Sequence, residues 1–220
     1  MTGQQRQQAI EQAWQDLVAT ARRTAAEGLV VGTSGNVSVR IGGLVLVTPS
    51  GVPYEQLAAE DPVAVGLDGR QLLGDLTPTS ELPLHLAVYR NTPAAAVVHT
   101  HAVHATAVST LVPELPLIHY MAAALGGAVR VAPYALYGSD ALAAGMLQAL
   151  RGRTACLLQN HGTVSYGDSL AQAYDRTAQL EWMCRLWLTA GSLPGHTPTL
   201  LSEAQVREAG EKLKGYGQSG

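Results

Sequence analysis

The chain has 220 residues, of which 47% are hydrophobic and 14% are charged, and this composition is typical of a globular protein rather than a disordered one. That length suits one domain with a substantial core, so we expect residues 1–220 to form a single domain. The net charge of −3, without any basic run, argues against nucleic acid as a partner. No apolar run is long enough to span a membrane and the N-terminus shows no signal peptide, so we expect a cytoplasmic protein.

The first half of the chain predicts one helix followed by two hairpins. Apolar residues recur at helical spacing through residues 4–27, and Gly28 ends this helix. Residues 37–40 and 43–51 are β-rich runs joined around Gly42 and Gly43. Residues 63–74 repeat the pattern with Asp68 and Gly69 at the turn, so each pair of runs predicts an antiparallel hairpin.

The second half alternates helices with apolar strands. Helices are predicted over residues 80–92, from about His104, over 168–191 and over 202–214, while 94–101 and 154–162 read as buried strands. Cys156 and Cys184 stand alone, which favours two buried thiols over a disulfide. The order predicts an α/β fold with a central, mainly antiparallel sheet flanked by helices.

Two histidines end the predicted strand 94–101. Residues two apart on a strand point to the same side, so His99 and His101 can present two imidazoles to one point. Neutral imidazole is a common ligand of zinc, and unpaired imidazoles on a buried strand would be costly. On this spacing alone, metal binding and a solvent-facing polar pair are about equally supported.

A third histidine has a comparable position on the second strand. His161 ends the apolar run of residues 154–162, just before Gly162, which permits a tight turn. A lone histidine there would ordinarily be structural. Together, however, three histidines at two strand ends form the minimal ligand set of a catalytic zinc ion, with a fourth position open.

The segment PTSELPLH (residues 78–85) places a carboxylate where a helix begins. Thr79 or Ser80 suits the N-cap, and Glu81 lies in or beside the first turn, where the helix dipole stabilises negative charge. Taken alone, Glu81 reads more readily as a capping residue than as a functional one. His85 lies on the same helical face and can hydrogen-bond Glu81, and we expect His85, like His104 and His119, to have a supporting role.

Three short polar loops could bind an anion. They are GTSGN (residues 32–36), TPSG (48–51) and PTS (78–80), and backbone N–H groups in such turns can hold a phosphate without a basic side chain. None matches a nucleotide-binding fingerprint. Taken singly, each reads more readily as a simple turn than as an anion site.

Six motifs occur in order: TSGNVSVR, TPSGVPYEQL, PTSELPLHLAVY, AVVHTHAVHATAVS, IHYMAAALGG and LLQNHG. Together they resemble the class II aldolase/adducin family, over about residues 10–216. The resemblance implies a three-layer fold and one Zn²⁺ per subunit, or another divalent metal. His99, His101 and His161 would bind the metal, with Glu81 beside it as both ligand and proton-transfer group.

The resemblance also implies a phosphate pocket and an oligomer. The family's phosphate-binding positions fall on Gly35, Asn36, Ser50, Gly51, Thr79 and Ser80. Its catalytic tyrosines fall on Tyr120, which acts from a neighbouring subunit, and on Tyr216 near the C-terminus. The family is typically a homotetramer with its sites at subunit interfaces.

Within the family, the chain is most similar to the aldolases that cleave L-fuculose 1-phosphate to dihydroxyacetone phosphate and L-lactaldehyde. Position 79 is usually Ser in those enzymes, and Thr79 retains the hydroxyl. Aldolases of other deoxypentulose phosphates, a ribulose-phosphate 4-epimerase and a methylthioribulose-1-phosphate dehydratase are enzymatic alternatives. The epimerase typically has Asp where this chain has Glu81. A non-catalytic interaction domain like the adducin head is the alternative of another class, and loss of the metal ligands would mark it.

Overall fold

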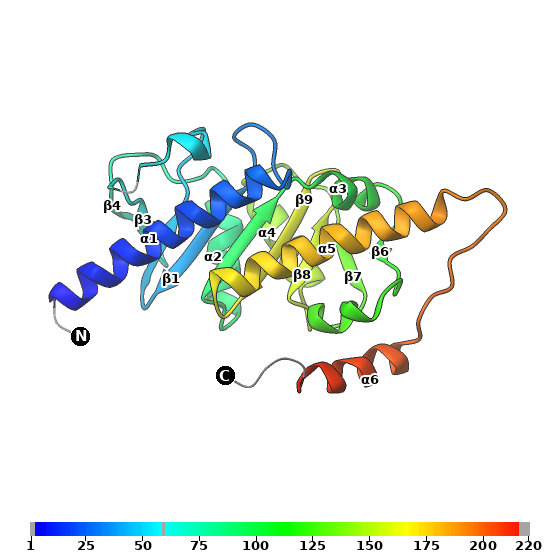
Figure 1. Cartoon of the computed structure of the whole chain (residues 1–220). Coiled ribbons are helices and arrows are strands. Elements are labelled where there is room, and N and C mark those ends of the chain that lie inside the picture. Colours follow the sequence, from blue (N-terminus) through cyan, green and yellow to red (C-terminus); the bar gives the residue numbers. More distant parts are fainter. Residues whose placement is uncertain (1–2, 59, 216–220) are drawn as a thin grey trace.

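A single nine-stranded sheet runs through the molecule, in a computed structural model that describes residues 3–58 and 60–215 (Figure 1). Its strand order is β4-β3-β2-β1-β5-β9-β8-β7-β6. The strands are β1 (Asn36–Ile41), β2 (Leu44–Val47), β3 (Ala64–Gly66), β4 (Gln71–Leu73), β5 (Ala96–Thr100), β6 (Glu114–Leu115), β7 (Val129–Ala132), β8 (Ala155–Leu158) and β9 (Gly162–Gly167). Neighbouring strands are antiparallel except β7 and β8, which are parallel, so the predicted mainly antiparallel sheet is confirmed.

Helices cover both faces of the sheet. They are α1 (Gly3–Ala26), α2 (Leu82–Asn91), α3 (Val103–Ser109), α4 (Asp140–Ala149), α5 (Leu170–Gly191) and α6 (Glu203–Leu213), with 3₁₀ turns η1 (Tyr54–Gln56) and η2 (Tyr120–Leu125). In Figure 1, α1 and α5 cross the near face, whereas α2 and α4 lie behind the sheet. The result is a three-layer α/β/α arrangement, as the sequence predicts.

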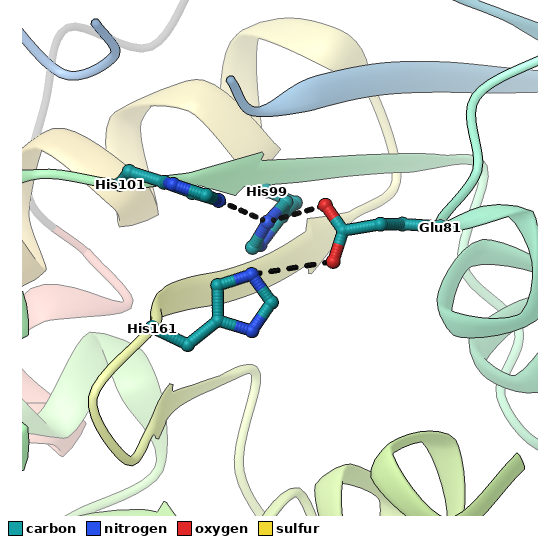
Figure 2. Close-up of side chains that lie close together, drawn as sticks. All are labelled: Glu81, His99, His101 and His161. Carbon is teal, nitrogen blue, oxygen red and sulfur yellow. Dashed lines mark hydrogen bonds and ion pairs between the residues drawn. The ribbon is translucent and has the colours of Figure 1, made fainter. Parts of the chain in front are cut away.

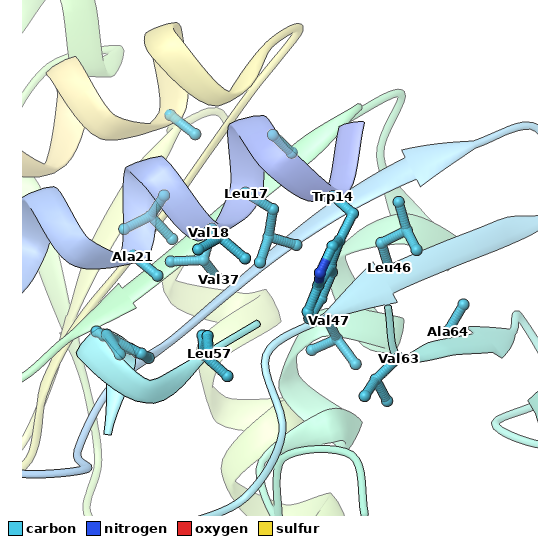
Figure 3. Packing of buried hydrophobic residues seen from close by; sticks show 14 of the residues in the cluster. Trp14, Leu17, Val18, Ala21, Val37, Leu46, Val47, Leu57, Val63 and Ala64 are labelled. Atoms are coloured by element: carbon cyan, nitrogen blue, oxygen red, sulfur yellow. The ribbon is translucent and has the colours of Figure 1, made fainter. Parts of the chain in front are cut away.

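Strand β5 shows how side-chain alternation divides the core. Ala96 and Val98 pack with α1, including Trp14, in one apolar cluster, part of which is shown in Figure 3. Val97 faces the opposite way and packs with α2 and α4. Because successive residues on a strand alternate sides, His99 follows Val97 onto the α2 face.

The predicted hairpins are confirmed, and glycines explain their turns. Strands β1 and β2 are joined by a two-residue turn, which the pair Ile41 and Leu44 closes. Gly42 in this turn has φ 61°, a conformation that glycine adopts without strain. β3 pairs with β4 across Gly69, at φ 89°.

The predicted N-cap at Thr79 or Ser80 is wrong. Helix α2 begins at Leu82, so Glu81 occupies the N-cap position, although its side chain makes no capping bond. The chain before it is held extended, because Pro78 bridges Pro49 and the Thr79 N–H donates to the Thr48 carbonyl (3.1 Å). Thr79 Oγ1 instead accepts a hydrogen bond from the Glu81 N–H (3.2 Å).

Both cysteines are buried and unpaired, as predicted. Within residues 3–58 and 60–215, no helix combines the length and the apolar character that crossing a membrane requires.

Candidate functional site

Four side chains from separate elements converge at one end of the sheet. His99 belongs to β5, His101 follows that strand by one residue, His161 lies in the turn between β8 and β9, and Glu81 precedes α2. One potential ligand atom from each lies within 4.8 Å of all the others, and Figure 2 shows the three rings and the carboxylate facing a common centre. The sequence predicted that His101 and His161 each end a strand. In the structure, both lie just beyond the strand.

The β8–β9 turn brings His161 beside the other histidines. Asn160 adopts a left-handed conformation (φ 55°), which asparagine tolerates better than most residues. At Gly162, an added Cβ would lie 2.0 Å from the Thr100 carbonyl oxygen, so only glycine allows β9 to approach β5 this closely. Thr100 pairs with Thr163 at the end of the ladder, so the turn that carries His161 lies next to His101.

The spacing within the cluster suits one small cation. The ring centroids of His99, His101 and His161 are 4.8–4.9 Å apart in pairs, and the rings are close to perpendicular, at 73–86°. Glu81 Oε2 lies 2.9 Å from His99 Nε2, and Glu81 Oε1 lies 3.2 Å from His161 Nε2. Tetrahedral zinc with bonds of about 2.0–2.1 Å would hold its ligand atoms about 3.3 Å apart.

The hydrogen bonds around His99 show why a cation fits. Its Nδ1 lies 2.7 Å from the Thr163 carbonyl, which can only accept, so Nδ1 is the donor in this contact. Nε2 is then the ring nitrogen left to bind a cation, and it faces the Glu81 carboxylate and His101 Nε2, 3.0 Å away. Acceptors facing one another in a buried site are unfavourable unless a positive charge lies between them.

The protonation states of His101 and Glu81 also favour a bound cation. Burial lowers the pKa of His101 to about 3, and neighbouring His99 and His161 add to the effect. Burial alone would raise the pKa of Glu81, but the adjacent His99 and His161 and the Asn36 amide hold that pKa far below its usual range. His101 is therefore neutral and Glu81 ionised, which are the forms that bind a metal ion.

Glu81 also carries an unsatisfied atom. Although His161 Nε2 is nearby, Oε1 is buried and makes no hydrogen bond of regular geometry with any described residue. Buried carboxylate oxygens ordinarily have partners, so this atom fits a site built for a metal ion or a substrate. The donor set, its spacing and this orphaned oxygen together fit a divalent metal.

The three polar loops lie next to this cluster. The bridge between Pro49 and Pro78 joins the loops of residues 48–51 and 78–80, and the Ser50 N–H donates to the Thr77 carbonyl (2.9 Å). In the third loop, an added Cβ on Gly35 would lie 2.9 Å from the His99 carbonyl. The structure therefore brings the three loops to the same end of the sheet.

The predicted phosphate-binding residues differ in exposure. Ser50, Gly51 and Ser80 are exposed, whereas Thr79 and Asn36 are buried. Asn36 lies opposite His99 in the ladder, and its Nδ2 donates to Glu81 Oε2 (3.0 Å).

The predicted hydrogen bond between His85 and Glu81 is wrong. Asn36 lies between the two residues, and His85 Nε2 contacts Asn36 Oδ1 at 2.6 Å. His104 contacts Glu181 (2.6 Å), and His119 Nδ1 accepts from the Met121 N–H (3.3 Å); neither residue belongs to the cluster of Glu81 and the three histidines.

A cavity of about 380 Å³ opens beside the cluster. Its wall consists of Glu81, His101, Tyr134, Ala135, Tyr137, Asn160 and His161. Tyr134, Tyr137 and Asn160 were not among the expected site residues, although the two tyrosines of PYALY (residues 133–137) were a visible signal. Close contact of Gly138 with the Ser80 carbonyl places this loop beside Glu81, since an added Cβ would lie only 2.6 Å from that oxygen.

Of the two predicted tyrosines, the structure describes Tyr120. Tyr120 begins η2, is 47% exposed and does not belong to the wall of this cavity within its own chain. Tyr216 lies outside the described residues.

Comparisons with known proteins point to one family. The family model described as "Class II Aldolase and Adducin N-terminal domain" matches residues 15–188. An L-fuculose phosphate aldolase of Escherichia coli K12 is 42% identical over 192 residues, covering 86% of this chain and 88% of that protein. A 5-deoxy-D-ribulose 1-phosphate aldolase of Bacillus thuringiensis is 35% identical, covering 93% and 96%. A solved L-fuculose 1-phosphate aldolase superposes with a TM-score of 0.88 at 32% identity, covering 92% and 96%.

Proposed function

The chain belongs to the class II aldolase and adducin family and is a class II aldehyde-lyase, and we propose that it cleaves L-fuculose 1-phosphate or a closely related ketose 1-phosphate. The products would be dihydroxyacetone phosphate and an aldehyde such as L-lactaldehyde, and the reaction would be reversible. The observation that carries the proposal is the buried, ionised Glu81 between the three histidines and an open cavity. An interaction-only domain would have no need of such a cluster.

The metal would be Zn²⁺, held by His99, His101 and His161 with Glu81 beside it. A divalent cation bound there supplies Lewis-acid polarisation of the substrate carbonyl. The Thr163 carbonyl supports this assignment, because it fixes the tautomer of His99 that leaves Nε2 free to bind.

The chain's own residues would move the protons. Cleavage breaks the bond between C3 and C4, the hydroxyl on C4 loses its proton as the aldehyde forms, and C3 gains a proton. Glu81 would deliver the proton to C3 and remove it in the reverse direction. In synthesis, Tyr120 of a neighbouring subunit would hydrogen-bond or protonate the aldehyde oxygen, with Tyr216 as the second tyrosine of the site.

The phosphate would be bound by the loops at Gly35, Asn36, Ser50, Gly51, Thr79 and Ser80. Exposed Ser50 and Ser80 offer hydroxyls, and Asn36 retains a second amide hydrogen beyond the one directed at Glu81. Anchoring the phosphate away from the bond that breaks would orient the reacting carbons toward Glu81.

A homotetramer with sites at subunit interfaces would complete the site. Tyr120 supports this arrangement, because it is half exposed and stacks on His119, which in turn contacts exposed Trp182 (ring centroids 4.3 and 4.8 Å). Surface aromatic groups of this kind are typical of protein interfaces. The tetramer and the cytoplasmic location stay predictions.

A second candidate substrate is 5-deoxyribulose 1-phosphate, because a relative with that printed activity matches 93% of the chain. The two substrates share the dihydroxyacetone phosphate half and differ in the aldehyde, so synthesis assays separate them. We would measure kcat/KM for L-lactaldehyde, acetaldehyde and methylthioacetaldehyde with dihydroxyacetone phosphate, using Glu81→Gln as the inactive control. A clear preference for L-lactaldehyde is expected, a preference for acetaldehyde would reassign the substrate, and no condensation with any aldehyde would reject the proposal.

A further inference from the structure

We propose that His85 is a positioning residue that acts through Asn36 to hold the Glu81 carboxylate in its working orientation. The inference rests on the proposed function where it concerns proton transfer. Its effect on metal binding can be measured separately.

A continuous chain of buried hydrogen bonds links α2 to Glu81. His85 and Tyr89 lie one turn apart on α2, and Asn36 and Ser38 lie two apart on β1, so two residues of each element face one another. Ser38 Oγ lies 2.7 Å from the Tyr89 hydroxyl and 2.6 Å from His85 Nδ1. His85 Nε2 lies 2.6 Å from Asn36 Oδ1, and Asn36 Nδ2 lies 3.0 Å from Glu81 Oε2.

The proton positions along this chain follow from its Glu81 end. An ionised carboxylate only accepts, so Asn36 must direct its NH₂ group to Glu81 and its carbonyl to His85. His85 Nε2 must then carry a hydrogen, and Nδ1 of the neutral ring accepts from the Ser38 hydroxyl. Ser38 in turn accepts from the Tyr89 hydroxyl. With the other neutral tautomer of His85, Nε2 and the Asn36 carbonyl would be two acceptors facing each other.

With a hydrogen on Nε2, the imidazole stabilises the orientation in which the Asn36 amide directs its NH₂ group to Glu81. His85 is fully buried, and a buried polar ring is costly unless its nitrogens are hydrogen-bonded, whereas an apolar side chain would fill this part of the core without that cost. The His85 ring therefore contributes its hydrogen bonds in addition to packing. Residues that orient the groups around a metal typically contribute about 10–100-fold in metal affinity or activity.

Two substitutions separate positioning from packing. His85→Leu removes both ring nitrogens while filling the space, and His85→Gln keeps an N–H donor near the position of Nε2. Thr177→Val is the matched control, because Thr177 is also fully buried and donates to the Ala173 carbonyl within α5. Zinc affinity by chelator competition, kcat, KM and Tm would be measured for all three.

We expect His85→Leu to lose about tenfold or more in zinc affinity and in kcat, with KM for dihydroxyacetone phosphate nearly unchanged. His85→Gln should recover most of both, and Thr177→Val should lose stability alone. Wild-type zinc affinity and kcat in a folded His85→Leu protein would overturn the proposal. So would equal losses in the Leu and Gln variants, or losses that follow Tm across all three.

A measurement on the unaltered protein covers the case in which His85→Leu does not fold. ¹⁵N NMR of the zinc-loaded chain should show His85 protonated at Nε2 and unprotonated at Nδ1. The opposite tautomer would contradict the proposal directly. If the zinc-affinity pattern holds but no aldehyde condenses, the proposed function fails while the positioning role of His85 stands.

Discussion

Replacing Gly162 by Ala tests whether the close approach of β5 and β9 builds the metal centre. The new Cβ would lie 2.0 Å from the Thr100 carbonyl oxygen and 3.2 Å from the His101 Cα. Restoring an acceptable contact requires the strands to separate by roughly 1 Å in a close-packed interior. Both atoms are backbone, so no side-chain rotation can relieve the clash.

The cost should appear in stability and in metal binding. Overpacking of this severity corresponds to about 3 kcal/mol, which for a domain of this size lowers Tm by about 6–12 °C. Strand separation would move His161 away from His99 and His101. Since functional groups need placement within about 0.5 Å, we expect zinc affinity to fall at least tenfold.

The assay combines thermal unfolding of the zinc-free protein with chelator competition for zinc. Gly43→Ala is the control, because an added Cβ there meets no atom within 4 Å and its φ is not positive. We expect the control to match the wild type in both measurements. A Gly162→Ala protein with wild-type Tm and wild-type zinc affinity would refute the reasoning about this contact.

Three further predictions concern the charge, the metal and the pH response of the site. Glu81→Gln keeps the shape but loses the proton-transfer group, so kcat in the aldehyde assay should fall by about 10²–10⁴ while zinc still binds; near-native kcat would exclude the role. Removing zinc should lower Tm, because zinc at 1,000 times its Kd stabilises the fold by about 4 kcal/mol, and readdition should restore it in calorimetry. Burial lowers the pKa of His85 to about 3 from 6.5, so its contribution to stability is complete above pH 6.5 and is lost as pH falls toward 3. Urea unfolding of the zinc-free protein at pH 7 and pH 5 measures this loss. Between these pH values, the free energy of unfolding should fall less in His85→Gln than in the wild type, and an equal fall would argue against a lowered His85 pKa.

Local patterns indicated the candidate metal ligands, because those patterns depend on short-range geometry, whereas only the family resemblance predicted that the ligands converge. The spacing of His99 and His101 follows from strand periodicity, and Gly162 after His161 indicated a turn. The structure adds that His101 and His161 lie beyond the strands, where the backbone is free to direct their rings to one point.

Contacts that depend on strand register could not be predicted in the same way. Asn36 was expected in the phosphate pocket from its loop, but only its pairing opposite His99 in the β1–β5 ladder brings its amide to Glu81. The link from His85 to Asn36 further requires α2 to pack on that face of β1. Neither relation leaves a periodic signal in one sequence, so the buried chain from Tyr89 to Glu81 emerged only from the structure.

Glu81 shows how a local rule can point to the correct position and still give the wrong role. Propensity alone favoured a capping residue near the start of α2, and Glu81 does occupy the N-cap, yet its side chain makes no bond to the helix. Thr79 Oγ1 accepts from the Glu81 N–H, and the carboxylate faces His99 and His161 instead of the first helical turn. An N-cap carboxylate that gives up its capping bond loses about 0.5–2 kcal/mol of helix stability. Such a loss at an acidic residue that faces three histidines is typical of a functional site, where the placement of a reactive group costs local stability.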